Sequence, residues 1–180
     1  MNRFHAADEF KTEGGFLDPD LLTQSAPLMA LRDHWREARG TRLMPAHADL
    51  RPARMKAALP FLSLYEAVDG GNDFRIRLVG TAMVGAAGVD ETGKLLSESV
   101  HTHLAQRTRA VCRYVMRRRA GIRGVAPVTI SDTVDVLAYE GMWLPLARDG
   151  ESPDMVAACI VFATMDRLRL EAAMKPMADA

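Results

Sequence analysis

The spacing of apolar residues changes along the chain, and each spacing predicts a different element. Leu28, Leu31 and Trp35 recur at helical intervals with charged residues between them, which predicts an amphipathic helix. From residue 61 onward, apolar and polar positions alternate instead. Two strands, 61–68 and 74–80, are therefore expected, and the Asp-Gly-Gly-Asn-Asp turn between them predicts a β-hairpin.

The second half of the chain predicts one long helix followed by three strands. Apolar residues between 100 and 119 fall near one face of a helix, with arginines mostly elsewhere. Extended runs follow at 122–131, 134–146 and 155–163. We therefore expect an α+β fold: a five-stranded antiparallel sheet with helices on one face and an N-terminal amphipathic helix.

The length of 180 residues predicts one domain. The polar residues 1–20 are expected to be a flexible lead-in, residues 21–166 to form the domain with its leading helix, and residues 167–180 to be a partly helical tail. A domain of this length needs no disulfide or metal to stay folded, so Cys112 and Cys159 are interpreted as core residues.

Charge and hydropathy restrict the partners and the location. The 23 Lys and Arg residues balance the 23 Asp and Glu residues, which removes the global electrostatic argument for nucleic acid or an anionic membrane as a partner. Acidic residues stand near the N-terminus where a signal peptide needs an apolar core, and no run approaches about 18 apolar residues. We expect a cytoplasmic protein.

The sequence contains no G-x-S-x-G, H-E-x-x-H or C-x-x-C pattern, so we predict neither catalytic residues nor a metal site. Residues 88–94 fit the spacing of a phosphate-binding loop, but Leu95 stands where Ser or Thr would hold Mg²⁺. Asp90 and Glu91 inside the loop would also repel phosphate, which favours a tight turn.

Two groups of basic residues leave alternatives open. His101 and His103 could each be an axial haem ligand or could simply face water at a helix start. Within the arginine cluster of residues 107–123, a partner or anion surface would be formed by residues that share one helical stripe: Arg109, Arg113 and Arg117. A solvated helix face explains the same stripe.

Three strings resemble the PAS domain: residues 77–81 (RLVGT), 90–93 (DETG) and 139–146 (YEGMWLPL), the last followed by Asp149-Gly150. The chain is similar in particular to a bacterial family of small PAS-like proteins that consist of little more than this domain. The resemblance runs from about residue 28 to residue 162. It implies a sensory or interaction module in which a five-stranded sheet and its helices enclose a pocket.

Apolar residues of the predicted strands and helices would line that pocket or fill the core: Met83, Leu95, Leu96, Leu104, Val111, Trp143 and Ile160. The cofactor stays unknown. The sequence lacks a cysteine in the asparagine-cysteine-arginine setting that flavin-based light sensors of this superfamily use.

From the resemblance we expect a non-catalytic module that binds a small ligand in its core pocket and signals through protein contacts with an unidentified signalling protein. A homodimer is expected through the apolar stripe of the leading helix, formed by Leu28, Leu31 and Trp35. One alternative is a small-molecule enzyme in the same pocket, with His101, His103 or Tyr139 as acid or base. Another is a structural adaptor without a ligand.

Overall fold

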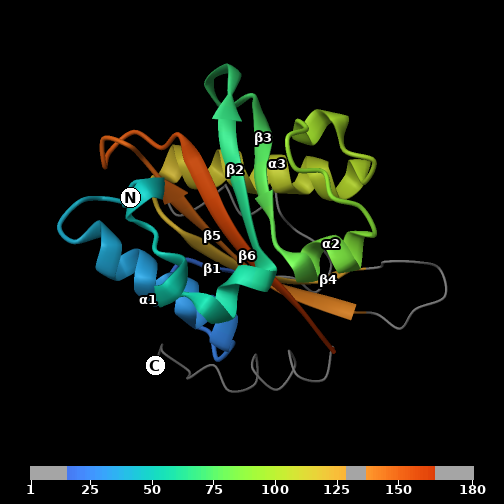
Figure 1. The fold of residues 1–180 in the computed structure, drawn as a ribbon, viewed down its shortest axis with the longest axis horizontal. Coiled ribbons are helices and arrows are strands. Elements are labelled where there is room, and N and C mark those ends of the chain that lie inside the picture. Colours follow the sequence, from blue (N-terminus) through green and yellow to red (C-terminus); the bar gives the residue numbers. More distant parts are fainter. Residues whose placement is uncertain (1–15, 129–136, 165–180) are drawn as a thin grey trace, which may run out of the picture.

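The computed structural model describes residues 16–128 and 137–164, which form one antiparallel sheet with helices around it (Figure 1). The sheet has six strands in the order β1-β4-β5-β6-β2-β3. The strands are β1 (Phe16–Asp18), β2 (Leu62–Val68), β3 (Asp73–Val79), β4 (Ile122–Val128), β5 (Leu137–Leu146) and β6 (Met155–Thr164).

The helices include both predicted ones. They are α1 (Ala26–Arg39), α2 (Thr81–Ala87) and α3 (Thr102–Arg118), together with short 3₁₀ helices η2 (His47–Asp49), η3 (Pro52–Arg54), η4 (Lys56–Phe61), η5 (Asp69–Gly71) and η6 (Leu96–Glu98). No helix of the described residues is both long enough and apolar enough to span a membrane.

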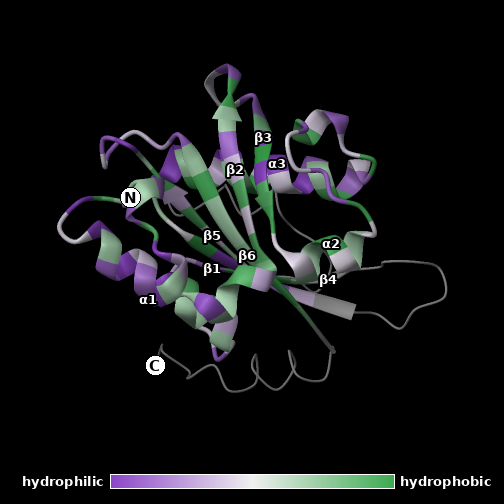
Figure 2. Cartoon of the chain, viewed as in Figure 1, coloured by the Kyte–Doolittle hydropathy of each residue, from purple (hydrophilic) through white to green (hydrophobic). Residues whose placement is uncertain are grey.

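Each face of the sheet carries its own hydrophobic core, because side chains alternate along a strand. On β5, Met142 and Leu144 point toward α1, whereas Trp143 points toward α3. Accordingly, α1 covers one face and α3 covers the other (Figure 1). Strand β6, in the middle of the sheet, is mostly hydrophobic, while the loop that precedes it is hydrophilic (Figure 2). This strand therefore contributes to both cores.

The predicted α+β fold with a PAS-like antiparallel sheet is confirmed, and the structure adds a sixth strand. Strand β1 lies within the expected lead-in and pairs with β4, so the prediction of a flexible segment is wrong at Phe16–Asp18. The Asp18 carboxylate accepts hydrogen bonds from the backbone N–H groups of Asp20 (2.9 Å) and Leu22 (2.8 Å) and lies 3.4 Å from Arg123. A three-residue strand is too short to show alternation, which is why the sequence pattern did not predict it.

Arg123 joins β1, β4 and β5 in a buried cluster of charges. Its Nε donates to Glu140 Oε1 at 2.6 Å, and the same carboxylate oxygen accepts a hydrogen bond from Thr23. Arg123, Glu140 and Asp18 are each at most 5% exposed. A buried charge is tolerated when it is paired and hydrogen-bonded, so these contacts fix how the N-terminal segment lies against the sheet.

The apolar stripe of α1 forms part of the core and not a dimer surface. Leu28 and Leu31 are fully buried and Trp35 is 6% exposed, packed against residues of β2, β5 and β6. The prediction that these three residues form a dimer interface is therefore wrong. The stripe does bury its apolar face, as an amphipathic helix must, but the sheet of the same chain supplies the partner.

Candidate ligand pocket

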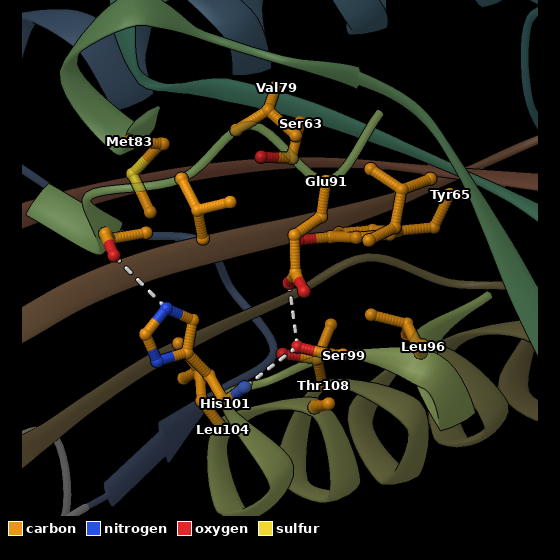
Figure 3. Close-up of a pocket in the computed structure, with 14 residues that line it drawn as sticks. Ser63, Tyr65, Val79, Met83, Glu91, Leu96, Ser99, His101, Leu104 and Thr108 are labelled. Atoms are coloured by element: carbon orange, nitrogen blue, oxygen red, sulfur yellow. Dashed lines mark hydrogen bonds between the residues drawn. The ribbon is translucent and has the colours of Figure 1, made fainter. Parts of the chain in front are cut away.

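A pocket of about 80 Å³ lies on the α3 side of the sheet, between the hairpin β2–β3 and the segments α2, η6 and α3 (Figure 3). Apolar and polar side chains share its wall. The apolar part is Ile76, Val79, Met83, Val89, Leu96 and Leu104, with Ala87 and Ala105, and the polar part is Ser63, Tyr65, Glu91, Ser99, His101 and Thr108. This mixture of many apolar groups and a few polar ones is typical of small-molecule sites.

The structure brings three of the seven predicted pocket residues together: Met83, Leu96 and Leu104 line the pocket. The other four lie elsewhere. Val111, Trp143 and Ile160 are buried in the core between α3 and the sheet, which was the alternative considered for all seven. Leu95 is half-buried and pairs with Arg75 at the edge of β3.

The polar wall of the pocket was not among the residues predicted from the sequence. Ser63 and Tyr65 lie two residues apart on β2, so they project from the same face of the sheet. His101, Leu104, Ala105 and Thr108 follow the spacing of one helix face. These two patterns could have identified the wall, but nothing in the sequence shows that the two faces meet.

Glu91 is the buried charge of the pocket. It is 8% exposed, and its Oε2 accepts a hydrogen bond from the Ser99 hydroxyl at 2.6 Å (Figure 3). Its Oε1 accepts one from the Val100 N–H at 2.9 Å. Lys94 Nζ lies 3.7 Å from Oε1. Burial by itself raises the pKa of Glu91, but these hydrogen bonds together with Lys94 and His101 hold that pKa below its ordinary value. Glu91 is therefore a carboxylate at neutral pH.

Tyr65 contributes a neutral hydroxyl to the same wall. Its side chain is buried, and this burial, with the nearby Cys112 and Glu91, raises the pKa of the phenol above its ordinary value, although the Ser63 hydroxyl opposes the shift. The phenol therefore stays protonated and can either donate or accept a hydrogen bond.

His101 closes one side of the pocket and is bonded to the backbone. Its Nε2 lies 3.1 Å from the Ala87 carbonyl oxygen, so this nitrogen carries the proton and donates (Figure 3). Its ring does not bond Ser99, whose hydroxyl donates to Glu91. A nucleophile activated by an adjacent base needs such a bond, and the residues described around this pocket do not provide it.

The other candidate groups are separated from this site. His103 is exposed on α3. Arg107 donates a hydrogen bond of 3.2 Å to the Tyr139 hydroxyl, and its guanidinium carbon lies 5.7 Å from the centre of that ring. Within the described ranges 16–128 and 137–164, no group of three His, Cys, Asp or Glu side chains could hold a metal ion.

The segment that resembles a phosphate-binding loop forms the predicted tight turn. The Thr92 N–H donates to Asp90 Oδ1 at 2.9 Å, and the Gly93 N–H donates to the Ile76 carbonyl at 2.7 Å. Gly93 has φ of 95°, a conformation that favours glycine. The turn places Glu91 against the start of α3, so this segment builds the pocket wall and does not cradle a phosphate.

Two arginines of the predicted anion surface hold the β2–β3 turn. Arg109 Nη2 donates to the Asn72 carbonyl at 2.8 Å, and Arg113 Nε donates to the Gly71 carbonyl at 3.1 Å. Backbone carbonyls of the same chain therefore take part of the donor set of both guanidiniums, and Arg109 Nε lies 3.4 Å from Asp73 Oδ1. An anion surface at these two residues stays a prediction. Arg117 lies further along α3 and is exposed.

Cys112 and Cys159 are both fully buried and free, one in each core, as expected from the sequence. Burial raises the pKa of the Cys159 thiol to about 12, and the nearby Glu140 carboxylate adds to this shift. Burial likewise raises the pKa of Cys112. Neither thiol is a nucleophile at neutral pH.

An antiparallel sheet with a small mixed pocket beneath short helices defines an α+β domain with a candidate ligand site. A PAS domain family model matches residues 23–161, and the chain belongs to this family. PAS domains are generally sensory, non-catalytic modules that signal to partner proteins.

Comparison with solved structures gives a match to a sensory box histidine kinase/response regulator from Burkholderia thailandensis E264. That chain is 17% identical, and the similarity covers 69% of the present chain and 93% of the other with a TM-score of 0.39. No curated protein sequence matches the chain.

Proposed function

We propose that the protein is a non-catalytic cytoplasmic sensory module that binds a small ligand in the pocket beneath α2, η6 and α3 and signals through protein contacts. The observation that carries this proposal is the polar wall of an otherwise apolar cavity. Removing a carboxylate and hydroxyls from water is costly, so a core that only has to pack is more simply filled with apolar groups. A ligand site needs such groups to orient its ligand.

The size of the pocket limits the ligand to a few atoms. Pockets for drug-sized ligands measure roughly 300–1,000 Å³, and an engineered cavity that takes benzene measures about 150 Å³. The pocket of about 80 Å³ is smaller than both. A compact metabolite with three or four non-hydrogen atoms is therefore the scale of ligand that we propose.

A signal has a short path from this pocket to the surface. The His101 ring bonds the carbonyl of Ala87, the last residue of α2. In the chain, His101 directly follows Val100, which is 65% exposed. Leu104 lines the pocket and is itself 46% exposed. A ligand that moves the start of α3 would therefore change an exposed apolar surface, which is the kind of surface that protein partners recognise.

Native mass spectrometry of the protein as purified tests the proposal. The wild type should carry an extra small mass that is released on denaturation. In Ala105→Leu the larger side chain enters the pocket, so the extra mass should be absent. Ala110→Leu on the same helix lies outside the pocket lining and should retain the extra mass. A wild-type spectrum without added mass would favour the structural adaptor. The subunit number in the same spectrum tests the homodimer that the sequence led us to expect.

A further inference from the structure

The chemistry around Glu91 restricts which small ligand the pocket can accept. A carboxylate has about four acceptor positions on its two oxygens. Among the described residues, Oε2 takes one short hydrogen bond, from Ser99, and Oε1 takes one short hydrogen bond, from Val100. Oε2 therefore keeps acceptor capacity for a donor that enters the pocket, whereas Oε1 also faces Lys94 Nζ at 3.7 Å.

The donors at the start of α3 that would attract an anion are already occupied. The hydroxyl of Ser99 and the N–H of Val100 precede α3, where an anion would be favoured by the helix dipole, but both donate to Glu91. His101 Nε2 donates to the Ala87 carbonyl. None of the residues that line the pocket is Lys or Arg in the part of the chain that the structure describes. Lys94 approaches Glu91 from outside the lining, at 3.7 Å, with its side chain 44% exposed.

The rest of the wall suits a short alkyl group. Val79, Met83 and Leu96 line the pocket together with Glu91. Figure 3 shows the Glu91 side chain reaching into the space between the lining side chains. A ligand with a charged N–H end and an alkyl end would match both parts. An anion would instead bring a second negative charge next to a buried carboxylate, which is unfavourable.

We infer that the pocket selects a small cation with N–H donors, a short-chain alkylammonium ion of three or four non-hydrogen atoms, through a charge-assisted hydrogen bond to Glu91. This inference rests on the proposed function, since it names the ligand class of the same pocket.

Protein-observed NMR of the full chain tests this selectivity with three probes of similar size: ethylammonium chloride, ethanol and sodium acetate. The titrations are compared at constant ionic strength, and the amide signals of Ser99, Val100 and His101 report on the pocket. Ethylammonium should give saturable shifts at these amides, and acetate and ethanol should give weaker shifts or none.

Two substitutions of the same kind separate the pocket from the surface. Glu91→Gln keeps the shape and one acceptor but removes the charge, and should weaken ethylammonium binding at least about tenfold, as expected for loss of a charge-assisted hydrogen bond. Glu98→Gln changes an exposed carboxylate on the neighbouring η6 and should leave the affinity unchanged. If Glu91→Gln does not fold, the relative affinities of the three probes for the wild type still test whether the pocket selects a cation.

The outcomes distinguish this inference from the proposal on which it rests. Binding of acetate or ethanol at these amides as strong as that of ethylammonium would overturn the alkylammonium class while leaving a ligand pocket in place. Equal effects of Glu91→Gln and Glu98→Gln on ethylammonium would also overturn it. No saturable shift with any probe would count against both.

Discussion

The indole N–H of Trp35 on α1 donates a hydrogen bond of 2.8 Å to the Pro145 carbonyl on β5. This bond lies inside the core that α1 forms with the sheet, where Trp35 is 6% exposed. The bond fixes α1 to strand β5. Together with the burial of Leu28 and Leu31, it leaves the apolar face of α1 covered by the sheet of the same chain.

Trp35→Phe should therefore lower the free energy of unfolding by about 1–3 kcal/mol, because the Pro145 carbonyl would remain buried without its donor. Chemical denaturation measures this change. Sedimentation of the same variant should show the wild-type mass, since Trp35 does not form a subunit contact. A variant of wild-type stability would show that the bond contributes nothing.

Gly141 on β5 is covered by the Trp143 ring. A methyl group at Gly141 would come within 2.4 Å of this ring, so Gly141→Ala should destabilise the protein by about 1–3 kcal/mol through overpacking. Gly85 in α2 has no atom within 4 Å of the same added methyl group and provides the matched control. Gly85→Ala should raise stability by about 0.5–1 kcal/mol, because alanine favours the helix. Denaturant midpoints that move in the same direction for both variants would contradict this account.

The clamp on the β2–β3 turn gives a third prediction. Arg113 bonds the Gly71 carbonyl through Nε, and a second contact reaches the Asn72 carbonyl. Arg113→Lys keeps the charge but loses the planar fork, so hydrogen exchange of the amides in the turn 69–72 should become faster. Unchanged exchange in this turn would mean that charge alone, without the fork, is sufficient.

Part of the fold and less of the site could be predicted from the sequence. Periodic segments such as the helix around Leu31 and the hairpin strands were correct, because hydrophobic spacing reports directly on which side of an element is buried. The pattern could not show that Leu31 meets the sheet of its own chain and not a second subunit, since both surfaces are apolar. Glu91 was assigned to a tight turn, but its role in the pocket depends on Ser99 and Val100 across the loop, and such contacts leave no local pattern.

The buried thiols predict a simple reactivity pattern. Because burial and the nearby Glu140 raise the pKa of Cys159 to about 12, and burial also raises that of Cys112, neither should react with a thiol reagent in the native protein at pH 8. Both should react after unfolding in denaturant. Mass spectrometry measures the rate of labelling. If the native protein is labelled as fast as a free thiol, the core around that cysteine opens and the prediction is wrong.

Acid should destabilise the wild type partly through Glu91. The pKa of this carboxyl is lower in the folded protein than its ordinary value of 4.5, so its contribution to stability is present above that value and is lost as the pH falls through the lowered pKa. Glu91→Gln does not titrate. The stability difference between wild type and Glu91→Gln should therefore shrink from pH 7 to pH 3 in denaturant titrations, and a constant difference would contradict the assignment.

The central claim is that a small ligand occupies the pocket and stabilises the protein around it. The most direct test strips the protein by unfolding and dialysis, refolds it, and measures its thermal midpoint with and without a deproteinised small-molecule extract of the cells that produced it. A ligand that binds only the folded state must raise the midpoint. The account predicts such a rise for the wild type and none for Ala105→Leu, in which the pocket is filled. Equal midpoints of the wild type with and without the extract would contradict it.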